Sequence, residues 1–373
     1  MPNATAAPSN SRAPSPEFWQ GRKVLITGHT GFKGGWLNLW LSMMGAKIIG
    51  YALHPPENDC FFRESERDGT LVSHRADIRD RAAITTLLKE FEPEIVFHLA
   101  AESLVLRAHQ YPVATFDTNV MGTVNLLEAL RSVPSVKSCV IVTTDKVYKQ
   151  GEDNRGFVES DSLGALEPYG ASKAACEFVV ESYRHSYFDE SIPSIGIASA
   201  RSGNVLGGGD WCADRLVPDA IRAFRTGDTL PIRHPNAVRP WQYVLEPLCG
   251  YLLLAEALHD APDKFNKAWN FGSGIDDSWP VSAIANRLVE LWQGDAHWEG
   301  DKKLYPYESQ ILRLDSTRSK KELEWMPILD LGEALEWTVQ WYKAHHSGQE
   351  MSASSRACIE QYVTRLNHQV SAA

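Results

Sequence analysis

Short apolar runs rich in β-branched residues alternate with longer amphipathic runs through the first two hundred residues. The apolar runs are KVLIT, AKIIGYAL, EIVFHLAA, CVIVTT and SIGIASAR, and segments with helical spacing such as PVATFDTNVMGTVNLLEALRSV separate them. Apolar strands between amphipathic helices are typical of a parallel sheet covered on both faces. The pattern predicts an α/β fold, a doubly wound parallel sheet of the Rossmann type, with a ligand site at the carboxyl ends of its strands.

The alternation stops near Asn204, where the glycine-rich segment GNVLGGGDW begins a mixed region with long loops. We expect residues 17–203, with contributions from later segments, to form the Rossmann domain, and residues 204–345 to form mainly a smaller, mixed α/β substrate-binding lobe. Helical spacing predicts two later helices, over EPLCGYLLLAEALHD and LGEALEWTVQWYKAHH. Residues 1–16 are expected to be a flexible leader, and residues 346–373 a C-terminal tail with a short helix over ACIEQYVTRL.

Composition narrows the range of functions. The 373 residues carry a net charge of −10 and no run of lysines or arginines, which argues against nucleic acid or an anionic membrane as partner. No apolar stretch approaches the roughly 20 residues of a membrane span. The six cysteines lack metal-ligand spacing, so we expect reduced thiols, no bound metal and a cytoplasmic location.

A glycine-rich turn joins the first expected strand to a helix. Glycines in this turn permit a tight bend, close approach of the backbone to a pyrophosphate and close packing of helix on strand, and the helix N-terminus then faces the phosphates. An ordinary tight turn is the alternative. We expect the turn to bind a dinucleotide through Gly28, Thr30, Gly31, Phe32 and Gly34.

Two later strand ends are placed to complete a dinucleotide site. Asp77 and Ile78 follow the third expected strand, where they could offer a carboxylate to the adenine amino group and an apolar wall to its ring. A solvated loop aspartate is the alternative for Asp77. Ala100 and Ala101 end the fourth strand, where small residues let the backbone approach the ribose and nicotinamide. Beside them, His98 is expected to be a strand-end histidine with satisfied hydrogen bonds rather than a catalyst.

Two polar residues four positions apart indicate acid-base chemistry. Tyr169 and Lys173, in YGASK, share one face of a helix. A neighbouring ammonium favours the phenolate, so we expect a lowered pKa for Tyr169, which can then act as a base toward a hydroxyl. Thr144, at the end of SCVIVTT, could hold the same oxygen. The motif alone arises often by chance, and the glycine-rich turn upstream gives it weight.

With these residues assembled, the chain resembles the extended short-chain dehydrogenase/reductase superfamily and, within it, the family of CDP-glucose 4,6-dehydratases. The resemblance spans about residues 17–345 and rests on GRKVLITGHTGFKGGWL, DIRD, TNVMGTVNLLEA, TTDKVY, GNVLGGGDW and RPWQYVLEPLCGYLLLAE. It implies NAD as cofactor, a nucleotide sugar as substrate with CDP-glucose as the first expectation, and a homodimer. The implied reaction oxidises sugar carbon 4, removes water across carbons 5 and 6, and reduces carbon 6.

The resemblance also implies roles for single residues. Asp145 would be the acid toward the hydroxyl that leaves carbon 6, and Lys146 the base at carbon 5. Both roles need pKa values shifted by a dry pocket, and mutual pairing would oppose these shifts. Asn204 and Arg239 are expected to contact substrate phosphate or sugar, with a lobe-stabilising ion pair as the alternative for Arg239. Asn119 would order the backbone near the site.

Several positions depart from the usual family pattern. Glu102 and Ser103 are expected to face the substrate, and a carboxylate there would be unfavourable beside an anion unless a cation neutralises it. The second strand ends at residues 50–54 without the acid that normally binds the adenosine ribose, and Glu57 and Asp59 come later. NADP therefore stays open beside NAD. Differences in YGASK and in YPYES, at 305–309, leave the nucleotide and the hexose open.

Three alternatives follow from the same residues. A 4,6-dehydratase of another nucleotide sugar would share the whole site. A sugar-nucleotide 4-epimerase would share the fold and the Tyr169–Lys173 pair, but it would not need the Asp145–Lys146 pair. A sensor that binds dinucleotide without turnover is the least favoured, because it would have no use for Thr144, Tyr169 and Lys173.

Overall fold

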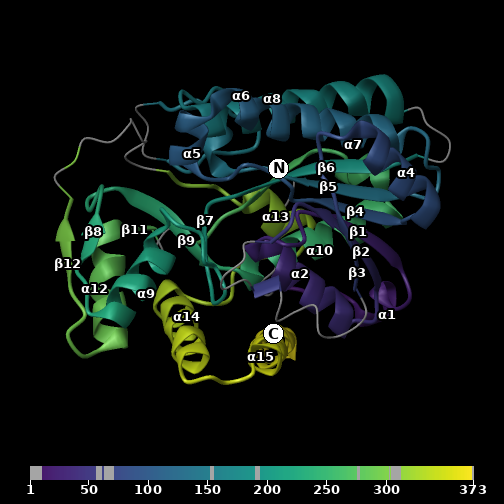
Figure 1. Cartoon of the computed structure of the whole chain (residues 1–373). Helices are drawn as coiled ribbons and strands as arrows, with labels where there is room; N and C mark the ends of the chain where they lie inside the picture. The colour runs from purple at the N-terminus through teal and green to yellow at the C-terminus, as the bar shows by residue number, and fades with distance from the viewer. Residues whose placement is uncertain are drawn as a thin grey trace, which may run out of the picture.

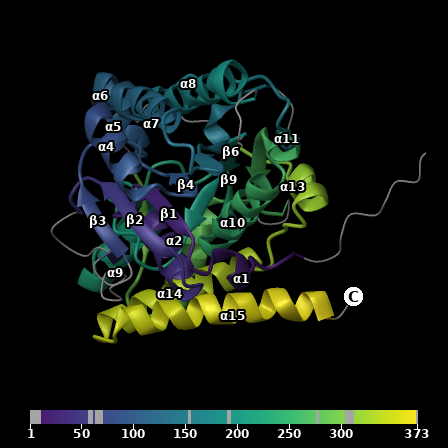
Figure 2. The same ribbon diagram turned by 90° about the vertical axis from the view of Figure 1, so that its right-hand side faces the viewer.

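Seven parallel strands form the central sheet of the chain (Figures 1 and 2). The computed structural model describes residues 11–55, 61–62, 71–151, 155–189, 194–274, 278–301, 303 and 312–371. The sheet has the order β10-β6-β5-β4-β1-β2-β3. Its strands are β1 (Lys23–Thr27), β2 (Lys47–Ala52), β3 (Leu71–Arg75), β4 (Ile95–His98), β5 (Ser138–Val142), β6 (Gly196–Ser202) and β10 (Ala268–Phe271). The strand order reverses between β1 and β4, so the switch point of this doubly wound sheet lies there, and the predicted fold class is confirmed.

Helices cover both faces of the sheet. Side chains alternate along each strand, so Val24 and Ile26 of β1 belong to one hydrophobic core and Leu25 belongs to the other. The first core includes residues of α2 (Phe32–Met43) and α10 (Leu245–Asp260). The second includes residues of α4 (Arg81–Phe91), α7 (Gly122–Leu130) and α8 (Pro168–Tyr183).

A smaller mixed unit lies beside the sheet, on the left of Figure 1. It contains the three-stranded sheet β11-β9-β7 and the parallel pair β12-β8. The strands are β7 (Asn204–Leu206), β8 (Leu230–Ile232), β9 (Val238–Tyr243), β11 (Ser278–Pro280) and β12 (Trp298–Gly300), and the helices are α9 (Leu216–Thr226), α12 (Val281–Trp292) and α14 (Leu331–His346). Between the segments of this unit, α10 and β10 return to the Rossmann domain.

Shorter helices complete the described chain. They are α1 (Pro16–Trp19), α5 (Val105–Gln110), α6 (Pro112–Phe116), the π-helix η2 (Asp117–Met121), the 3₁₀-helix η3 (Asp145–Val147), the π-helix η4 (Arg184–Phe188), α11 (Pro262–Phe265) and α13 (Thr317–Glu322). The segment with helical spacing between β4 and β5 is helical throughout α6, η2 and α7, which follow one another without a gap. Among the described residues, none of the helices is both long and apolar enough to cross a membrane.

The two ends of the chain differ from the expected leader and tail. Ser11 is buried, and Arg12 pairs with Glu256 of α10 at 2.9 Å, so the described part of the leader is held against the domain. At the other end, α15 (Met351–Ser371) is much longer than the helix expected there. Its residue Tyr362 is fully buried, and α15 runs along the base of the molecule in Figure 2.

Candidate active site

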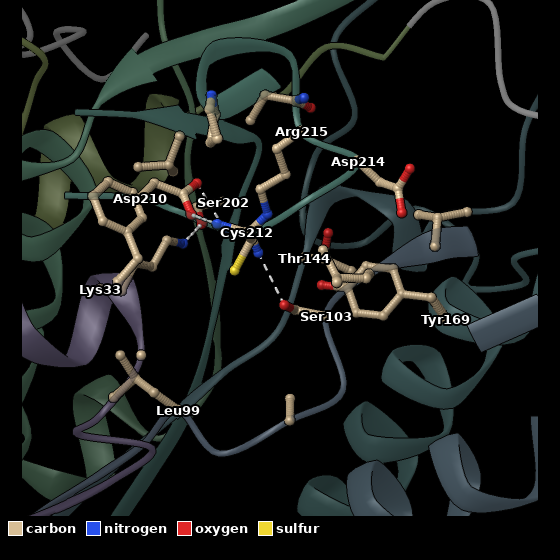
Figure 3. A pocket seen from close by; sticks show the side chains of 18 of the residues that line it. Lys33, Leu99, Ser103, Thr144, Tyr169, Ser202, Asp210, Cys212, Asp214 and Arg215 are labelled. Carbon is tan, nitrogen blue, oxygen red and sulfur yellow. Dashed lines mark hydrogen bonds and ion pairs between the residues drawn. The ribbon is translucent and has the colours of Figure 1, made fainter. Parts of the chain in front are cut away.

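A cavity of about 590 Å³ lies at the carboxyl ends of the strands, between the sheet and the smaller unit (Figure 3). The glycine-rich turn, the ends of β2, β4 and β5, the start of α8 and the segment 202–219 all contribute to its wall. The expected site residues that line it are Gly28, Thr30, Gly31, Phe32, Gly34, Asp77, Ile78, Ala100, Ala101, Ser103, Thr144, Asp145, Lys146, Tyr169, Lys173, Asn204 and Arg239.

The glycine-rich turn forms a cradle of bare backbone. Gly28 has a φ of 75°, and a Cβ placed there would lie 2.7 Å from the backbone nitrogen of Ala100. A Cβ at Gly34 would collide with the carbonyl oxygen of Gly28. Helix α2 begins directly after Gly31, and no side chain caps its N-terminus, so its first N–H groups are available to an anion. These features fit the pyrophosphate of a dinucleotide.

At the far end of the cavity, Asp77 is held by a neighbouring arginine. Arg79 pairs with its carboxylate at 2.6 Å, and the backbone N–H of Arg79 donates to it at 2.9 Å. Hydrogen bonding from Arg79 holds the pKa of Asp77 below its ordinary value. Asp77 is thus an ionised, partly engaged acceptor at the edge of the cavity, and Ile78 beside it is buried. Arg79 also lines the cavity, which the sequence analysis did not predict.

His98 has the structural role expected of it. Its Nδ1 lies 2.7 Å from the hydroxyl of Thr27, and its Nε2 lies 3.1 Å from that of Thr123. Burial lowers the pKa of His98 to about 3. The expectation of a satisfied, neutral strand-end histidine is confirmed, and the adjacent Ala100 lines the cavity.

Helix α8 presents Tyr169 and Lys173 to the cavity from successive turns. The carboxylate of Glu167 caps this helix by accepting hydrogen bonds from the backbone N–H groups of Tyr169 and Gly170 at 2.8 and 2.6 Å. Lys173 donates from Nζ to the carbonyl oxygen of Val142 at 3.0 Å, at the end of β5. The backbone at Tyr169 and the side chain of Lys173 are therefore held by contacts within α8 and to the strand beside it.

The pKa of Tyr169 differs from the expectation. Burial raises it above its ordinary value, although hydrogen bonding to Thr144 and the charge of Arg215 act in the opposite direction. Burial also lowers the pKa of Lys173. The prediction that Lys173 lowers the pKa of the phenol is therefore wrong for the protein alone, because the cost of a buried phenolate exceeds the effect of its neighbours.

Directly after β5, the turn η3 carries Asp145 and Lys146. Thr144 caps η3, since its hydroxyl accepts from the backbone N–H of Lys146 at 3.4 Å and donates to Oδ1 of Asp145 at 3.0 Å. Asp145 is buried, and its Oδ2 has no hydrogen-bond partner among the described residues. Burial raises the pKa of Asp145 despite the opposing charge of Lys146. Burial thus shifts the pKa of Asp145 in the direction that an acid catalyst needs.

Neighbouring strands of the smaller unit form another part of the cavity wall. Asn204 on β7 and Arg239 on β9 both line the cavity, and these strands pair in parallel. Arg239 is buried, and its Nη1 donates to the carbonyl oxygen of Val238 at 3.0 Å.

Glu102, by contrast, is absent from the cavity wall as described. Its carboxylate pairs with Arg107 of α5 at 2.7 Å. This arginine supplies the cation that neutralises the charge of Glu102. The side chain of Asn119 holds the same segment, because its Oδ1 accepts from the backbone N–H of Glu102 at 2.8 Å and its Nδ2 donates to the carbonyl oxygen of Glu102 at 3.0 Å. Nδ2 of Asn119 also donates to Ser172 of α8 at 2.8 Å. Asn119 thus orders backbone beside the site, as expected.

Residues 25–338 match the family described as GDP-mannose 4,6 dehydratase. The chain belongs to this family. It is 42% identical over 350 residues to CDP-glucose 4,6-dehydratase of Salmonella typhimurium (strain LT2). The matched region makes up 93% of this chain and 98% of the relative. It is 28% identical over 342 residues to dTDP-glucose 4,6-dehydratase of Xanthomonas campestris pv. campestris, which covers 85% and 92% of the two chains.

Solved structures of the same fold include dehydratases and epimerases. The dTDP-glucose 4,6-dehydratase of Streptomyces venezuelae with NAD and TYD bound has a TM-score of 0.75 at 23% identity, covering 88% of this chain and 99% of that one. UDP-glucose 4-epimerase of Thermotoga maritima with UDP-glucose has a TM-score of 0.74 at 22% identity, covering 87% and 99%. At such identities, the likeness shows the fold alone.

Two cations of this dehydratase-family chain lie in the cavity where the sequence analysis had not placed them (Figure 3). Lys33, within the glycine-rich turn, donates to the hydroxyls of Ser202 at 2.8 Å and Tyr251 at 3.2 Å, and burial lowers its pKa to about 7. Arg215, at the start of α9, pairs with Asp210 at 2.9 Å and donates to Ser103 at 2.9 Å. Lys33 could have been found from the sequence, because it lies within GFKGG. Arg215 could not, because the residue it bonds to, Ser103, is 112 positions away.

Proposed function

We propose that the protein catalyses the NAD-dependent 4,6-dehydration of a nucleotide-diphosphate hexose, converting CDP-D-glucose to CDP-4-keto-6-deoxy-D-glucose. The observation that carries this proposal is that a single cavity joins the Tyr169–Lys173 pair to the Asp145–Lys146 turn. The first pair suits oxidation of an alcohol, and the second suits removal of water. The relative that is 42% identical over nearly the whole chain supports CDP-glucose as the substrate.

The residues of the Rossmann domain fit the cofactor. The turn from Gly28 to Gly34 would hold the pyrophosphate at the N-terminus of α2, Asp77 and Ile78 the adenosine, and Ala100 and Ala101 the nicotinamide. When bound, NAD accepts a hydrogen with its electron pair from one sugar carbon and returns it to another. Glu57 and Asp59 are the acidic residues that could distinguish NAD from NADP, and they lie outside the described residues. The likeness to the family favours NAD.

Oxidation at carbon 4 needs a base at the sugar hydroxyl. Tyr169 takes the hydroxyl proton, and Thr144 holds the same oxygen by hydrogen bonding. Lys173, anchored at the carbonyl oxygen of Val142, supplies positive charge from the next turn of α8. Because burial opposes a phenolate, these neighbours must act together to make proton transfer feasible.

Elimination needs a base and an acid at adjacent carbons. A ketone at carbon 4 acidifies the hydrogen on carbon 5, and Lys146 removes that proton. The electron pair left on carbon 5 forms a double bond to carbon 6, and the hydroxyl of carbon 6 leaves as water with the proton of Asp145. The raised pKa of Asp145 supports this role, as does its Oδ2, which bonds to none of the described residues. Asn204 and Arg239, which line the same cavity, would hold the nucleotide diphosphate or sugar.

An apolar surface supports a homodimer of the protein. Five large apolar side chains on or beside α6, η2 and α8 are exposed, and α6 and η2 pack against α8. They are Tyr111, Val113, Phe116, Met121 and Phe178. A second copy that paired the same helices would cover this surface.

The five described cysteines are free thiols, which fits the cytoplasm.

The experiment that tests the function presents purified protein with NAD and, separately, CDP-, dTDP-, GDP- and UDP-hexoses. We expect a 4-keto-6-deoxy product from CDP-glucose, followed by its absorbance and by NMR, and at most slow conversion of the others. The Tyr169→Phe variant serves as the inactive control. A product that is epimerised at carbon 4 and keeps its hydroxyl on carbon 6 would replace the dehydratase with an epimerase. No turnover of any of the four would contradict the proposal.

A further inference from the structure

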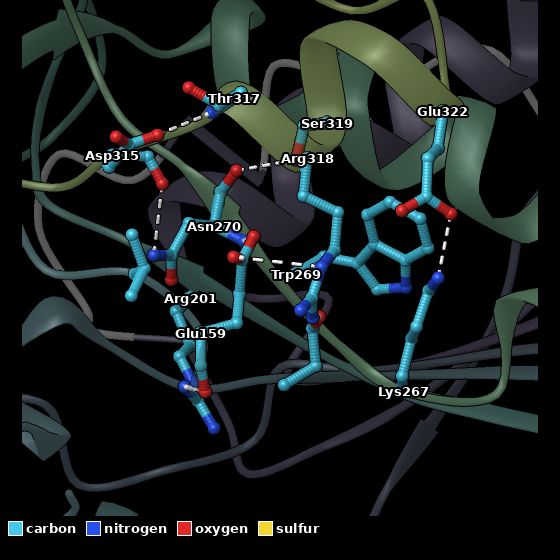
Figure 4. A network of polar contacts seen from close by, with 12 residues as sticks. Glu159, Arg201, Lys267, Trp269, Asn270, Asp315, Thr317, Arg318, Ser319 and Glu322 are labelled. Atoms are coloured by element: carbon cyan, nitrogen blue, oxygen red, sulfur yellow. Dashed lines mark hydrogen bonds and ion pairs between the residues drawn. The ribbon is translucent and has the colours of Figure 1, made fainter. Parts of the chain in front are cut away.

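A buried cluster ties the catalytic turn η3 to strands far away in the sequence. Tyr148, the residue that follows η3, is fully buried. Its hydroxyl donates to Oδ1 of Asn270 at 2.7 Å and accepts from Nη1 of Arg201 at 2.8 Å. Asn270 lies on β10 and Arg201 on β6, and both belong to the polar network in Figure 4. The exit of the turn is thus bonded to the edge of the central sheet.

The ring of Tyr148 is fixed as firmly as its hydroxyl. Phe157 stacks on it, with ring centroids 4.8 Å apart and an interplanar angle of 3°. Nδ2 of Asn270 donates to the carbonyl oxygen of Phe157 at 2.8 Å, so the same asparagine holds both aromatic residues. The guanidinium of Arg201 lies 5.0 Å from the centroid of the Tyr148 ring. Rotation or displacement of Tyr148 would break several of these contacts at once.

The turn itself has little rigidity of its own. It is three residues long, and the bonds of its cap are local, at 3.0 and 3.4 Å. Short 3₁₀ segments have poorer hydrogen-bond geometry than α-helices. Tyr169 and Lys173, by comparison, belong to the 16-residue helix α8, which is capped by Glu167. The bonds of Tyr148 act directly on the exit of the turn, next to Asp145 and Lys146, and they reach α8 through Arg201.

Arg201 contacts both α8, which carries Tyr169 and Lys173, and the exit of the turn that carries Asp145 and Lys146. Its Nη2 pairs with Glu177 of α8 at 2.8 Å, while its Nη1 bonds to Tyr148. Glu177 also accepts a hydrogen bond from Ser199 at 2.6 Å. A change at Arg201 would disturb α8 and the turn together, so Tyr148 is the informative position.

We propose that Tyr148 is a positioning residue for the elimination step, holding η3 through Asn270 and Phe157 so that Lys146 and Asp145 face carbons 5 and 6 of the sugar. This inference rests on the proposed function. Removing the hydroxyl of Tyr148 takes a donor from Oδ1 of Asn270 and loosens the exit of the turn. Nη1 of Arg201 loses an acceptor as well but keeps the carbonyl oxygen of Glu159, and its Nη2 keeps Glu177. A displacement of about 1 Å at reacting groups can cost up to about a hundredfold in rate, so the step that uses Lys146 and Asp145 should slow selectively.

The test compares Tyr148→Phe with a matched control, Tyr362→Phe. Tyr362 is also fully buried and also donates from its hydroxyl, to Glu246 at 2.6 Å, but it lies on α15 away from the cavity. Two rates are measured for each protein. One is exchange of the carbon 5 hydrogen of CDP-4-keto-6-deoxyglucose with deuterated solvent, followed by NMR without net turnover. The other is formation of reduced nicotinamide after rapid mixing with CDP-glucose.

In Tyr148→Phe, exchange at carbon 5 is expected to slow by about tenfold or more, while reduction stays within about twofold of wild type. Tyr362→Phe is expected to change neither rate. Equal slowing of both rates in Tyr148→Phe, or no change in either, would overturn the inference. Phe157→Leu, which removes the ring stack and leaves the polar groups, provides the same comparison if Tyr148→Phe does not fold. Wild-type protein that reduces no nicotinamide with CDP-glucose would instead count against the proposed function.

Discussion

The two residue pairs that we propose to act in catalysis are built in different ways. Tyr169 and Lys173 occupy successive turns of α8, a 16-residue helix, so the geometry of this pair follows from the local backbone. Asp145 and Lys146 are neighbours on a three-residue turn, and Tyr148 at its exit bonds to Asn270, 122 positions away. The comparison teaches that the two pairs rest on different elements, α8 and η3, so a suitable mutation should be able to separate the two steps.

The largest effect on turnover is expected when the base of the oxidation pair, Tyr169, is removed. Tyr169→Phe should lower turnover of CDP-glucose by about a thousandfold, because general bases contribute about 10²–10⁴ to rate. No reduced nicotinamide should form, since the reaction stops before carbon 4 is oxidised. Rapid-mixing absorbance and product NMR measure the two effects. Turnover close to that of wild type would show that another group takes the proton.

Lys146→Ala should break the elimination pair and leave the oxidation pair working. Net dehydration should fall by about a hundredfold or more, while reduced nicotinamide still forms and then persists. Cofactor affinity, measured by calorimetry, should be unchanged because Lys146 lies on the turn rather than in the glycine cradle. Dehydration at the wild-type rate would remove Lys146 from the role of base.

A third part of the site uses backbone alone, and Gly28→Ala tests it. The new Cβ would lie 2.7 Å from the nitrogen of Ala100 at a φ of 75°, so we expect a loss of about 1–3 kcal/mol in stability or cofactor binding. Gly227→Ala is the matched control, because Gly227 has the same φ of 75° and no neighbour within 4 Å of the added Cβ. Calorimetry of both variants isolates the clash. Equal losses in the two would attribute the effect to φ alone.

The pH dependence should distinguish the two pairs as well. Burial raises the pKa of Asp145, and its protonated, active form predominates below that raised value. Water loss, followed as decay of reduced nicotinamide, should therefore decline as pH rises through the raised pKa, approaching about tenfold per pH unit. Asp145→Asn should be slow and should lose this declining limb. A limb that persists in Asp145→Asn would belong to another group.

The smallest effect is expected just outside the cavity. Glu102 pairs with Arg107, whose side chain is largely exposed, and such pairs contribute about 0–1 kcal/mol to stability. Glu102→Gln should therefore lower stability to thermal unfolding slightly and change KM for CDP-glucose less than about twofold. A large rise in affinity for CDP-glucose would show that the carboxylate does face the substrate.

Local patterns explain what could be predicted from the sequence. The apolar runs predicted β1, β2, β4, β5 and β6, because each is long enough to stand out between amphipathic segments. The glycine-rich turn and the spacing of Tyr169 and Lys173 are equally local. Strand β10 has four residues and follows a short helix, and its apolar run was too brief to indicate a place in the central sheet.

Contacts between distant residues could not be read in the same way. Tyr148 and Asn270, or Arg215 and Ser103, meet only when the chain folds, and no spacing in the sequence relates them. The pKa of Tyr169 was predicted wrongly for a related reason. Adjacency to Lys173 is visible in YGASK, but the burial that outweighs it depends on the whole cavity.

One measurement tests the central claim, that both pairs act on one sugar in one cavity. Purified protein with NAD is given CDP-glucose that carries deuterium at carbon 4, in ordinary water, and the product is examined by NMR. We predict CDP-4-keto-6-deoxyglucose with the deuterium in the methyl group at carbon 6. Deuterium that remains at carbon 4 of an epimer, or a product with no label at carbon 6, would contradict the account.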